Sequence, residues 1–361
     1  MKKLIFVVAV AIIAAVSCSK TYETRTSNSE GTPIMLGSWA DNLTKARTVG
    51  ASSFADGDKF FAYAYTSTGQ TPFEGTEVSF DGTSWSYSPL RFWDRNNDSY
   101  SFYGISPSEN VTAASLVYGN WVDGTFQSNS VTLSGANNDI LVADKKVVEK
   151  AHYGETVELN FRHINALFDL KVRKGSGIGD NGVLKVTGVS LENIDATGYF
   201  TVDSYDGTSN AANVTWHSTA AASYTDASGV NTVTTVSAAT PITTTGDQYL
   251  INNLVVMPQT FAASAQRLKI SYTITTGTGA TEQVNTFTDK TYDLVLFDNT
   301  DYPTDDNAGE AGNQYNEGTN VSGFVGGVHY TYIITIDAET ITFNATMTDW
   351  TTDNGYYYIL N

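Results

Sequence analysis

In the stretch Thr156-Val157-Glu158-Leu159-Asn160-Phe161, apolar and polar residues alternate strictly. Successive side chains of a β-strand point to opposite faces, so this alternation predicts a strand with one buried and one solvated face. Runs rich in Val, Ile, Thr, Tyr and Phe recur between Gly, Asn and Asp residues, most clearly at 59–65, 99–105, 167–172 and 330–336. Beyond the signal-like N-terminus, no stretch sustains the i, i+3, i+4 apolar spacing of a helix. We therefore predict an all-β protein made of packed antiparallel sheets.

Length and composition predict two folded domains. The chain has 361 residues, of which 41% are hydrophobic, 12% aromatic and 16% charged, which is typical of a folded protein. The residues after position 31 are too many for one ordinary β-sandwich. A glycine-rich stretch at 174–182 is the best candidate boundary, to within about twenty residues. It gives an N-terminal β-sandwich domain at 32–178 and a C-terminal one at 179–361.

The same glycine-rich stretch contains a G-x-G-x-x-G spacing at Gly177, Gly179 and Gly182. A dinucleotide site needs such glycines between a strand and a helix whose N-terminus meets the pyrophosphate. Residues 183–187 have the composition of another strand instead. We interpret the stretch as a loop and not as a nucleotide site.

The charge balance excludes one class of partner. The formal net charge is -18 at pH 7 and the sequence pI is about 4.4. Such a chain has no basic stripe that could neutralise phosphates, so nucleic acid is not a predicted partner. Direct attraction to an anionic membrane surface is disfavoured for the same reason.

The N-terminus has the features of an export signal. Lys2 and Lys3 precede an apolar run at 4–16, which is shorter than the roughly 20 residues of a membrane-spanning helix. Small residues at 15–17 then precede Cys18, the single cysteine of the chain. This arrangement resembles the lipobox of bacterial lipoproteins, which implies a signal peptide at 1–17, an acylated Cys18 and a flexible polar tether at 18–31. The alternative is an ordinary secretory peptide with an incidental cysteine.

Signatures of catalysis, cofactors and metals are absent from the sequence. The four histidines are far apart in sequence, and there is no H-E-x-x-H or G-x-S-x-G motif. One cysteine excludes both a disulfide framework and a Cys-based zinc site within one chain. An acidic loop at 298–320 lacks the spacing of an EF-hand, so a solvated loop is the better interpretation than a calcium site. We predict no enzyme, no cofactor and no metal, and a structural role for His163 at a strand bend.

A series of landmarks spans nearly the whole chain: Cys18, 33–36 followed by 45–48, 54–58, 85–89, 92–93, 100–107, 139–143, 161–167, 254–259, 330–332 and 348–350. Each landmark is loose alone, but their order is specific. This order resembles the fimbrillin family of Bacteroidetes, the lipoprotein-derived subunits of the type V pilus and their Mfa-like relatives.

This resemblance implies two tandem transthyretin-like β-sandwich domains that polymerise by donor-strand exchange. In that family an arginine-specific protease removes the first N-terminal strand, and the emptied groove accepts an extended segment of another subunit. Here the removable strand would be at about 32–47, with Ile34 and Leu36 as its apolar residues and Arg47 as the processing site. The alternative is that 45–47 is an ordinary exposed turn.

The C-terminal residues 351–361 are the candidate donor strand. Tyr356, Tyr358 and Leu360 alternate there with Tyr357 and Ile359. A strand of this pattern could fill a groove in a neighbouring subunit through main-chain hydrogen bonds and alternate side-chain pockets. The alternative is a last strand that packs on its own domain.

Two functions are therefore compared. The first is a structural or adhesive stalk or tip subunit of a cell-surface fimbria, exported as an outer-membrane lipoprotein precursor. Its partners would be other fimbrillin subunits in a homo- or hetero-polymer, an arginine-specific protease, the outer membrane through the lipid anchor before processing, and an adhesion ligand on a host or bacterial cell. The second is a monomeric outer-membrane surface lipoprotein that binds glycans or host proteins, for which the six tryptophans are candidate contacts, although most are expected in the core.

Overall fold

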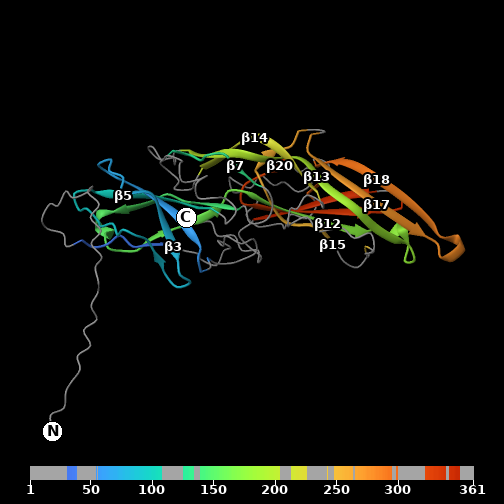
Figure 1. Ribbon diagram of the computed structural model, residues 1–361, viewed down its shortest axis with the longest axis horizontal. Helices are drawn as coiled ribbons and strands as arrows, with labels where there is room; N and C mark the ends of the chain where they lie inside the picture. Colours follow the sequence, from blue (N-terminus) through green and yellow to red (C-terminus); the bar gives the residue numbers. More distant parts are fainter. Residues whose placement is uncertain are drawn as a thin grey trace, which may run out of the picture.

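The computed structural model describes residues 31–38, 54, 56–107, 125–133, 139–203, 213–225, 242, 248–262, 265–294, 298–299, 322–338 and 341–349. Within these ranges the chain forms β-strands joined by turns. The helical elements there are three short 3₁₀ turns, η1 (Lys150–His152), η2 (Ser176–Ile178) and η3 (Gly279–Thr281). The all-β sandwich prediction is confirmed, and the strands form an elongated molecule (Figure 1).

The N-terminal half is built on one seven-stranded antiparallel sheet. Its strand order is β11 (Phe161–His163), β8 (Ile140–Ala143), β5 (Ser99–Pro107), β2 (Lys59–Thr66), β3 (Phe73–Phe80) and β4 (Trp85–Ser86), and β9 (Lys146–Glu149) also pairs with β5. Beside this sheet, β1 (Leu36–Ser38) and β10 (Val157–Leu159) form a two-stranded parallel sheet.

The seven-stranded sheet is buried on both faces at its central strands β2, β5 and β8. On one face, Phe60 and Ala62 belong to a core that also contains β1 and β10. On the other face, Phe61 and Tyr63 pack with Phe200 and other residues of the following half of the chain. Because a sheet covered on both faces needs apolar side chains on both, β2 has a nearly continuous apolar sequence instead of an alternating one.

A six-stranded sheet connects the two halves. Its main order is β14 (Asn213–Thr225), β13 (Val183–Asp203), β17 (Arg267–Thr276) and β18 (Gln283–Asp293). The 21-residue strand β13 pairs with β17 over its first part and with β14 over its second part. Two short strands of the N-terminal half, β6 (Phe126–Gln127) and β7 (Val131–Thr132), also pair with the second part of β13. The two halves are thus joined by backbone pairing.

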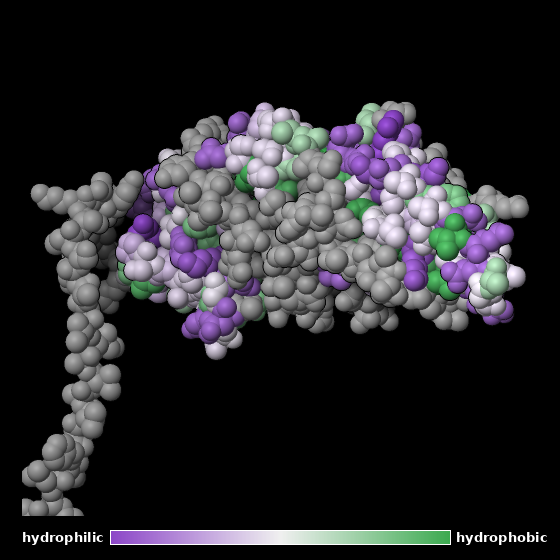
Figure 2. All heavy atoms as spheres, turned by 45° about the vertical axis from the view of Figure 1, so that its right-hand side comes forward, coloured by the Kyte–Doolittle hydropathy of each residue, from purple (hydrophilic) through white to green (hydrophobic). Residues whose placement is uncertain are grey.

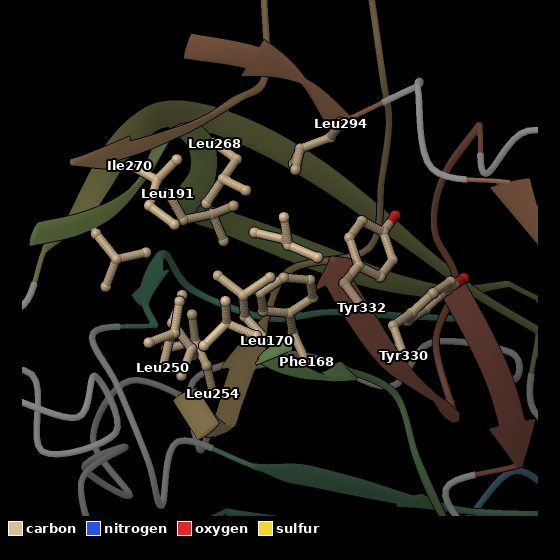
Figure 3. Packing of buried hydrophobic residues seen from close by; sticks show 14 of the residues in the cluster. Phe168, Leu170, Leu191, Leu250, Leu254, Leu268, Ile270, Leu294, Tyr330 and Tyr332 are labelled. Atoms are coloured by element: carbon tan, nitrogen blue, oxygen red, sulfur yellow. The ribbon is translucent and has the colours of Figure 1, made fainter. Parts of the chain in front are cut away.

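The C-terminal half is a sandwich of β13 and β17 against a five-stranded sheet. The order of that sheet is β15 (Gln248–Val256), β12 (Ala166–Lys174), β21 (Val328–Ile336), β22 (Ile341–Asp349) and β19 (Asp298–Asn299). The β12–β21 and β19–β22 pairs are parallel, and a further antiparallel pair joins β16 (Gln259–Thr260) to β20 (Gly323–Phe324). Figure 3 shows Phe168 and Leu170 of β12 between the layers, facing Leu268 and Ile270 of β17.

The predicted boundary at 174–182 is a structured turn. Lys174 Nζ donates hydrogen bonds of 2.9 Å to the carbonyl oxygens of Gly179 and Gly182. The strand that follows it is β13, so the loop interpretation of the three glycines fits the structure and no helix follows them. The change of sheet lies earlier, between His163 in β11 and Ala166 in β12. The division into domains at 32–178 and 179–361 stays a prediction.

The surface shown in Figure 2 is mostly polar or near-neutral, and the described helical turns are short. Hydrophilic and near-neutral residues predominate over the coloured surface in Figure 2, with hydrophobic residues in small separate groups. Among the described residues, none of the helical turns has the length and apolar character needed to cross a membrane.

Candidate functional site: the groove around residues 32–38

Residues 32–38 lie between two backbone neighbours. On one side, β1 pairs in parallel with β10, with Leu36 opposite Val157 and Ser38 opposite Leu159. On the other side, the chain runs antiparallel to residues 91–93, and Pro33 forms a bridge with Phe92. We call the space between β10 and residues 90–93, which residues 32–38 fill, the first-strand groove.

Backbone hydrogen bonds alternate between the two sides of this groove. The N–H of Trp93 donates to the Thr32 carbonyl at 3.1 Å, and the N–H of Ile34 donates to the Arg91 carbonyl at 2.8 Å. The Met35 carbonyl faces the other way and accepts from the N–H of Val157 at 2.8 Å. Removal of residues 32–38 would therefore leave unpaired backbone groups on both walls, which is the condition under which an extended segment is taken up.

A tyrosine hydroxyl completes one rung of this ladder. The Tyr87 hydroxyl donates to the Ile34 carbonyl at 2.6 Å and accepts from the N–H of Arg91 at 3.2 Å. Burial raises the pKa of Tyr87, so the hydroxyl keeps its proton. It serves as an inserted link between two backbone groups that would otherwise pair directly.

The floor of the groove is apolar. Ile34 is 0% exposed and Leu36 is 4% exposed. Their side chains belong to the core that also contains Phe60, Trp93 and Phe161. Burying two such side chains contributes on the order of 1.5–3 kcal/mol each. An emptied groove would expose this floor to water.

The outer face of the groove has an apolar side and an acidic side. Met35, Leu90 and Phe92 are 44%, 52% and 50% exposed. On the β10 side, the Glu158 carboxylate covers Gly37, where an added Cβ would come within 2.6 Å of Oε2. Partial burial raises the pKa of Glu158, against the opposing effect of the positive charge of Lys146.

Comparison with known families identifies the chain. A family model described as fimbrillin-like matches residues 44–350, most of the chain. The chain belongs to the fimbrillin-like family. The resemblance that the landmarks indicate is thereby confirmed.

Solved structures similar to this fimbrillin-like chain come from Bacteroides and Porphyromonas species. A fimbrial protein of Bacteroides vulgatus is 18% identical with a TM-score of 0.55, covering 88% of this chain and 99% of its own. A "putative cell adhesion protein" of Bacteroides uniformis is 14% identical with a TM-score of 0.49, covering 88% of this chain and 98% of its own. The tip fimbrial protein Mfa3 of Porphyromonas gingivalis is 10% identical with a TM-score of 0.35, covering 85% of this chain and 98% of its own. The search of curated proteins gave no match.

The structure of this fimbrillin-like chain brings together some of the predicted site residues. Ile34 and Leu36 lie side by side along the groove, with both side chains buried. Five other predicted residues lie outside the described residues, so their roles stay predictions: Cys18, Arg47, Tyr356, Tyr358 and Leu360.

Sequence reasoning missed the walls of the groove. Tyr87, Arg91 and Phe92 lie in or beside landmarks of the family pattern, but nothing local predicts that they line residues 32–36. The one available signal is Pro33, since it occupies a position of the ladder where no N–H is needed.

His163 and His329 link neighbouring segments of the sheets through buried carboxylates. His163 Nδ1 lies 2.7 Å from Asp139 Oδ2, and both side chains are buried at the end of β11. His329 Nε2 lies 2.8 Å from Asp169 Oδ2, while Asp169 Oδ1 accepts from the N–H of Asn253 at 2.6 Å. This second network links β21, β12 and β15. Both arrangements fit a structural role, as expected for His163.

Three of the six tryptophans lie in the part of the chain that the structure describes. Trp93 is 3% exposed and stacks on Tyr153 at 4.5 Å. Trp85 packs edge-on against Phe54 at 4.9 Å, and Trp216 donates from Nε1 to the Ile164 carbonyl at 2.9 Å. These three therefore pack within the protein. Among the residues that the structure describes, no group of three or more His, Cys, Asp or Glu is placed to hold a metal ion.

A second hollow lies where the two halves meet. It is a cleft of about 910 Å³ between β11, β14 and the β16–β20 pair. Its lining includes Arg162, Asn213, Thr215, Trp216, Gln259 and Phe324. The cleft shares no lining residue with the first-strand groove.

Proposed function

We propose that this protein is a structural or adhesive subunit of a cell-surface fimbria that assembles by exchange of its first strand. Membership of the fimbrillin-like family and the fold shared with a fimbrial protein support the fimbrial part of this proposal. The first-strand groove supports the exchange. Stalk and tip roles are both consistent with it.

The observation that carries the proposal is the construction of the groove. Residues 32–38 supply two buried side chains to a core and hydrogen bonds to two walls, but β1 itself has only three residues. Without this segment, the apolar floor and the unpaired backbone groups would favour any extended strand of the right pattern. Residues 351–361 of another subunit, with Tyr356, Tyr358 and Leu360 on one face, are the proposed occupant.

Processing would control this exchange. Cleavage after Arg47 by an arginine-specific protease would disconnect residues 32–47 from the rest of the subunit. Acylated Cys18 would hold the precursor on the outer membrane until that cut separates the lipid from the folded protein. Cleavage after Arg25 would leave residues 32–38 attached, and the groove would stay filled.

The test is to treat the purified protein with an arginine-specific protease and to measure its N-terminal sequence, its mass and its oligomers. The expected result is a new terminus at Thr48 followed by oligomers that resist SDS. Arg47→Gln should block both, and Arg25→Gln, the matched control, should change neither. A protein that is cut at Arg47, loses its N-terminal fragment and stays monomeric would overturn the proposal.

A second test concerns the donor. Deleting residues 356–361 should abolish the oligomers without changing the cut at Arg47. Polymerisation that continues unchanged would exclude these residues as the donor strand.

The cleft where the two halves meet favours one other candidate function. Polar side chains such as Asn213 and Gln259, beside Trp216, are the kind of lining that binds a glycan. On this alternative the protein is a monomeric surface lipoprotein that keeps its acylated Cys18. Saturable sugar binding that is lost in Asn213→Ala, together with an intact N-terminus, would favour it over the fimbrial subunit.

A further inference from the structure

The exposed side chains beside the first-strand groove carry an inference that rests on the proposed strand exchange. Leu90 and Phe92 are among the large apolar residues most exposed to solvent in the described part of the chain. They are next to each other on one wall of the groove, and we call this pair the outer ledge.

The hydrogen-bond register places the outer ledge against the outward face of the strand in the groove. The Thr32–Trp93 and Ile34–Arg91 positions carry the backbone hydrogen bonds. Pro33–Phe92 and Met35–Leu90 are therefore the non-hydrogen-bonded positions, where opposing side chains come closest. Since Ile34 and Trp93 point into the core, the four residues of these two positions point outward together.

Contacts at the N-terminal end of the segment agree with this register. A Cβ added at Gly31 would lie 2.5 Å from the Phe92 ring, so the ring rests on the backbone of Gly31. The ring is half exposed because this cover comes from one side only. Loss of residues 31–47 would remove Gly31, Pro33 and Met35 together and expose both ledge residues further.

A replacement strand would meet two apolar surfaces. Its inward residues would take the positions of Ile34 and Leu36, and its outward residues would lie beside Leu90 and Phe92. A strand with the usual polar outer face would leave the outer ledge uncovered. A strand that is apolar on both faces would cover the floor and the ledge at once.

We propose that the outer ledge selects the donor strand by its outward face, and that residues 351–361 of a second copy of this chain are the segment selected. In that segment Tyr357 and Ile359 alternate with Tyr356, Tyr358 and Leu360. In this inference Tyr356, Tyr358 and Leu360 face the core. Tyr357 and Ile359 then face the ledge, in whichever direction the strand runs. The ledge accounts for large apolar or aromatic side chains on both faces of residues 356–360.

The experiment uses the full chain cut after Arg47, with both fragments present, and a fluorescent peptide of residues 351–361. Binding of the peptide and release of the N-terminal fragment are measured together. In the variant Leu90→Ser/Phe92→Ser, peptide affinity should fall by about tenfold. Val284→Ser, a change at a side chain that is 55% exposed on β18, is the matched control and should have no effect.

Variants of the peptide keep the test independent of folding. A peptide with Tyr357→Ser and Ile359→Ser should bind the unchanged protein about tenfold more weakly than the unchanged peptide does. Against the ledge variant, the same peptide changes should cause little further loss of affinity, because the protein changes and the peptide changes remove the same contact. A peptide with Tyr358→Ser should lose the same factor against both proteins.

The outcomes separate the two proposals. If the unchanged protein binds the peptide but the ledge variant binds it equally well, or if the two sets of changes act independently, the outer ledge has no role in selection. If the cut protein rebinds a peptide of residues 31–47 but never the 351–361 peptide, a different segment is the donor and this inference fails. If it binds neither, the proposed strand exchange itself is overturned.

Discussion

Residues 32–38 and β12 both have backbone neighbours on two sides and both place apolar side chains in a core, but they differ in how the backbone is held. Ile34 and Leu36 are as buried as Phe168 and Leu170. The nine-residue β12 pairs with β21 over eight consecutive residues and with β15 on its other side. Among the described residues, the three-residue β1 pairs only with β10, and three further backbone hydrogen bonds hold residues 32–35.

The two segments also differ in the polar side chains that hold them. Asp169 of β12 contacts His329 on one neighbour and the backbone of Asn253 on the other, which fixes the register of three strands. In residues 32–38, the corresponding polar contacts are the hydrogen bond from the Tyr87 hydroxyl to the Ile34 carbonyl and the Glu158 carboxylate that lies against Gly37. The two segments are therefore similar in side-chain burial and differ in backbone pairing and in polar anchors. On the proposed strand exchange, fewer backbone pairs and fewer buried polar anchors would make residues 32–38 easier to replace than β12.

The largest effect is expected from Leu170→Ala in β12. This change leaves a cavity between two packed layers and should lower the free energy of unfolding by about 3 to 5 kcal/mol. Chemical denaturation measures it, with Arg173→Ala at an exposed position of the same strand as control. Loss of the N-terminal fragment after the cut at Arg47 should not change, and a large change there would mean that the two regions are coupled.

Ile34→Ala should act locally instead. It removes buried atoms from residues 32–38, at a cost of about 2 to 3 kcal/mol, which corresponds to about 30- to 150-fold weaker retention of the N-terminal fragment after cleavage. Size-exclusion chromatography of the cut protein measures the retained fraction. Met35→Ala changes the outward neighbour and should have a much smaller effect. Equal effects of the two would contradict the assignment of faces.

Tyr87→Phe should weaken the same segment by a smaller amount. It removes the hydroxyl that links the Ile34 carbonyl to the N–H of Arg91, at a cost of about 1 kcal/mol. The measurement is again retention of the fragment. Tyr65→Phe provides a comparison at a tyrosine outside the groove, and an equal loss there would exclude a specific role for Tyr87.

The smallest expected effect is a pH dependence at Glu158. Its pKa in the folded protein is raised from the model-compound value of 4.5, because partial burial disfavours the charged form. In the window between the two values the folded protein binds more protons than the unfolded one, so this contribution to stability falls as pH rises through that window. Unfolding of the unchanged protein and of Glu158→Gln is compared across mildly acidic pH. The stability of the unchanged protein relative to the variant should fall as pH rises through that window, and a relative stability that stays constant or rises would contradict the role of this carboxyl.

Much of the strand pattern could be predicted from the sequence, because alternation and composition are local. The predicted runs at 167–172 and 330–336 correspond closely to β12 and β21. The alternating run at 156–161 is also extended, but the structure divides it at Asn160 between β10 and β11, which belong to different sheets. Alternation predicts that one face of a strand is buried, but it does not indicate to which sheet the strand belongs.

The groove could be predicted only in part. Ile34 and Leu36 were identifiable as apolar residues before a basic segment, and the family pattern gave them a role. Their partners at 90–93 and 157–159 are distant in sequence, and such pairings depend on topology. The domain boundary at 174–182 stays a prediction, and the change of sheet lies earlier, between His163 and Ala166. Glycines at 175–182 indicate a turn, yet Lys174 anchors that turn within the C-terminal sandwich.

The continuous strand β13 also has a mechanical consequence for a filament. It extends without a turn from its pairing with β17 to its pairing with β6 and β7, along the long dimension of the molecule (Figure 1). A tensile force that pulls the two halves apart acts along this strand and strains its hydrogen bonds in shear, many at a time. Each subunit should therefore resist extension as a stiff unit, and the compliance of a fimbria would be concentrated at the joints between subunits.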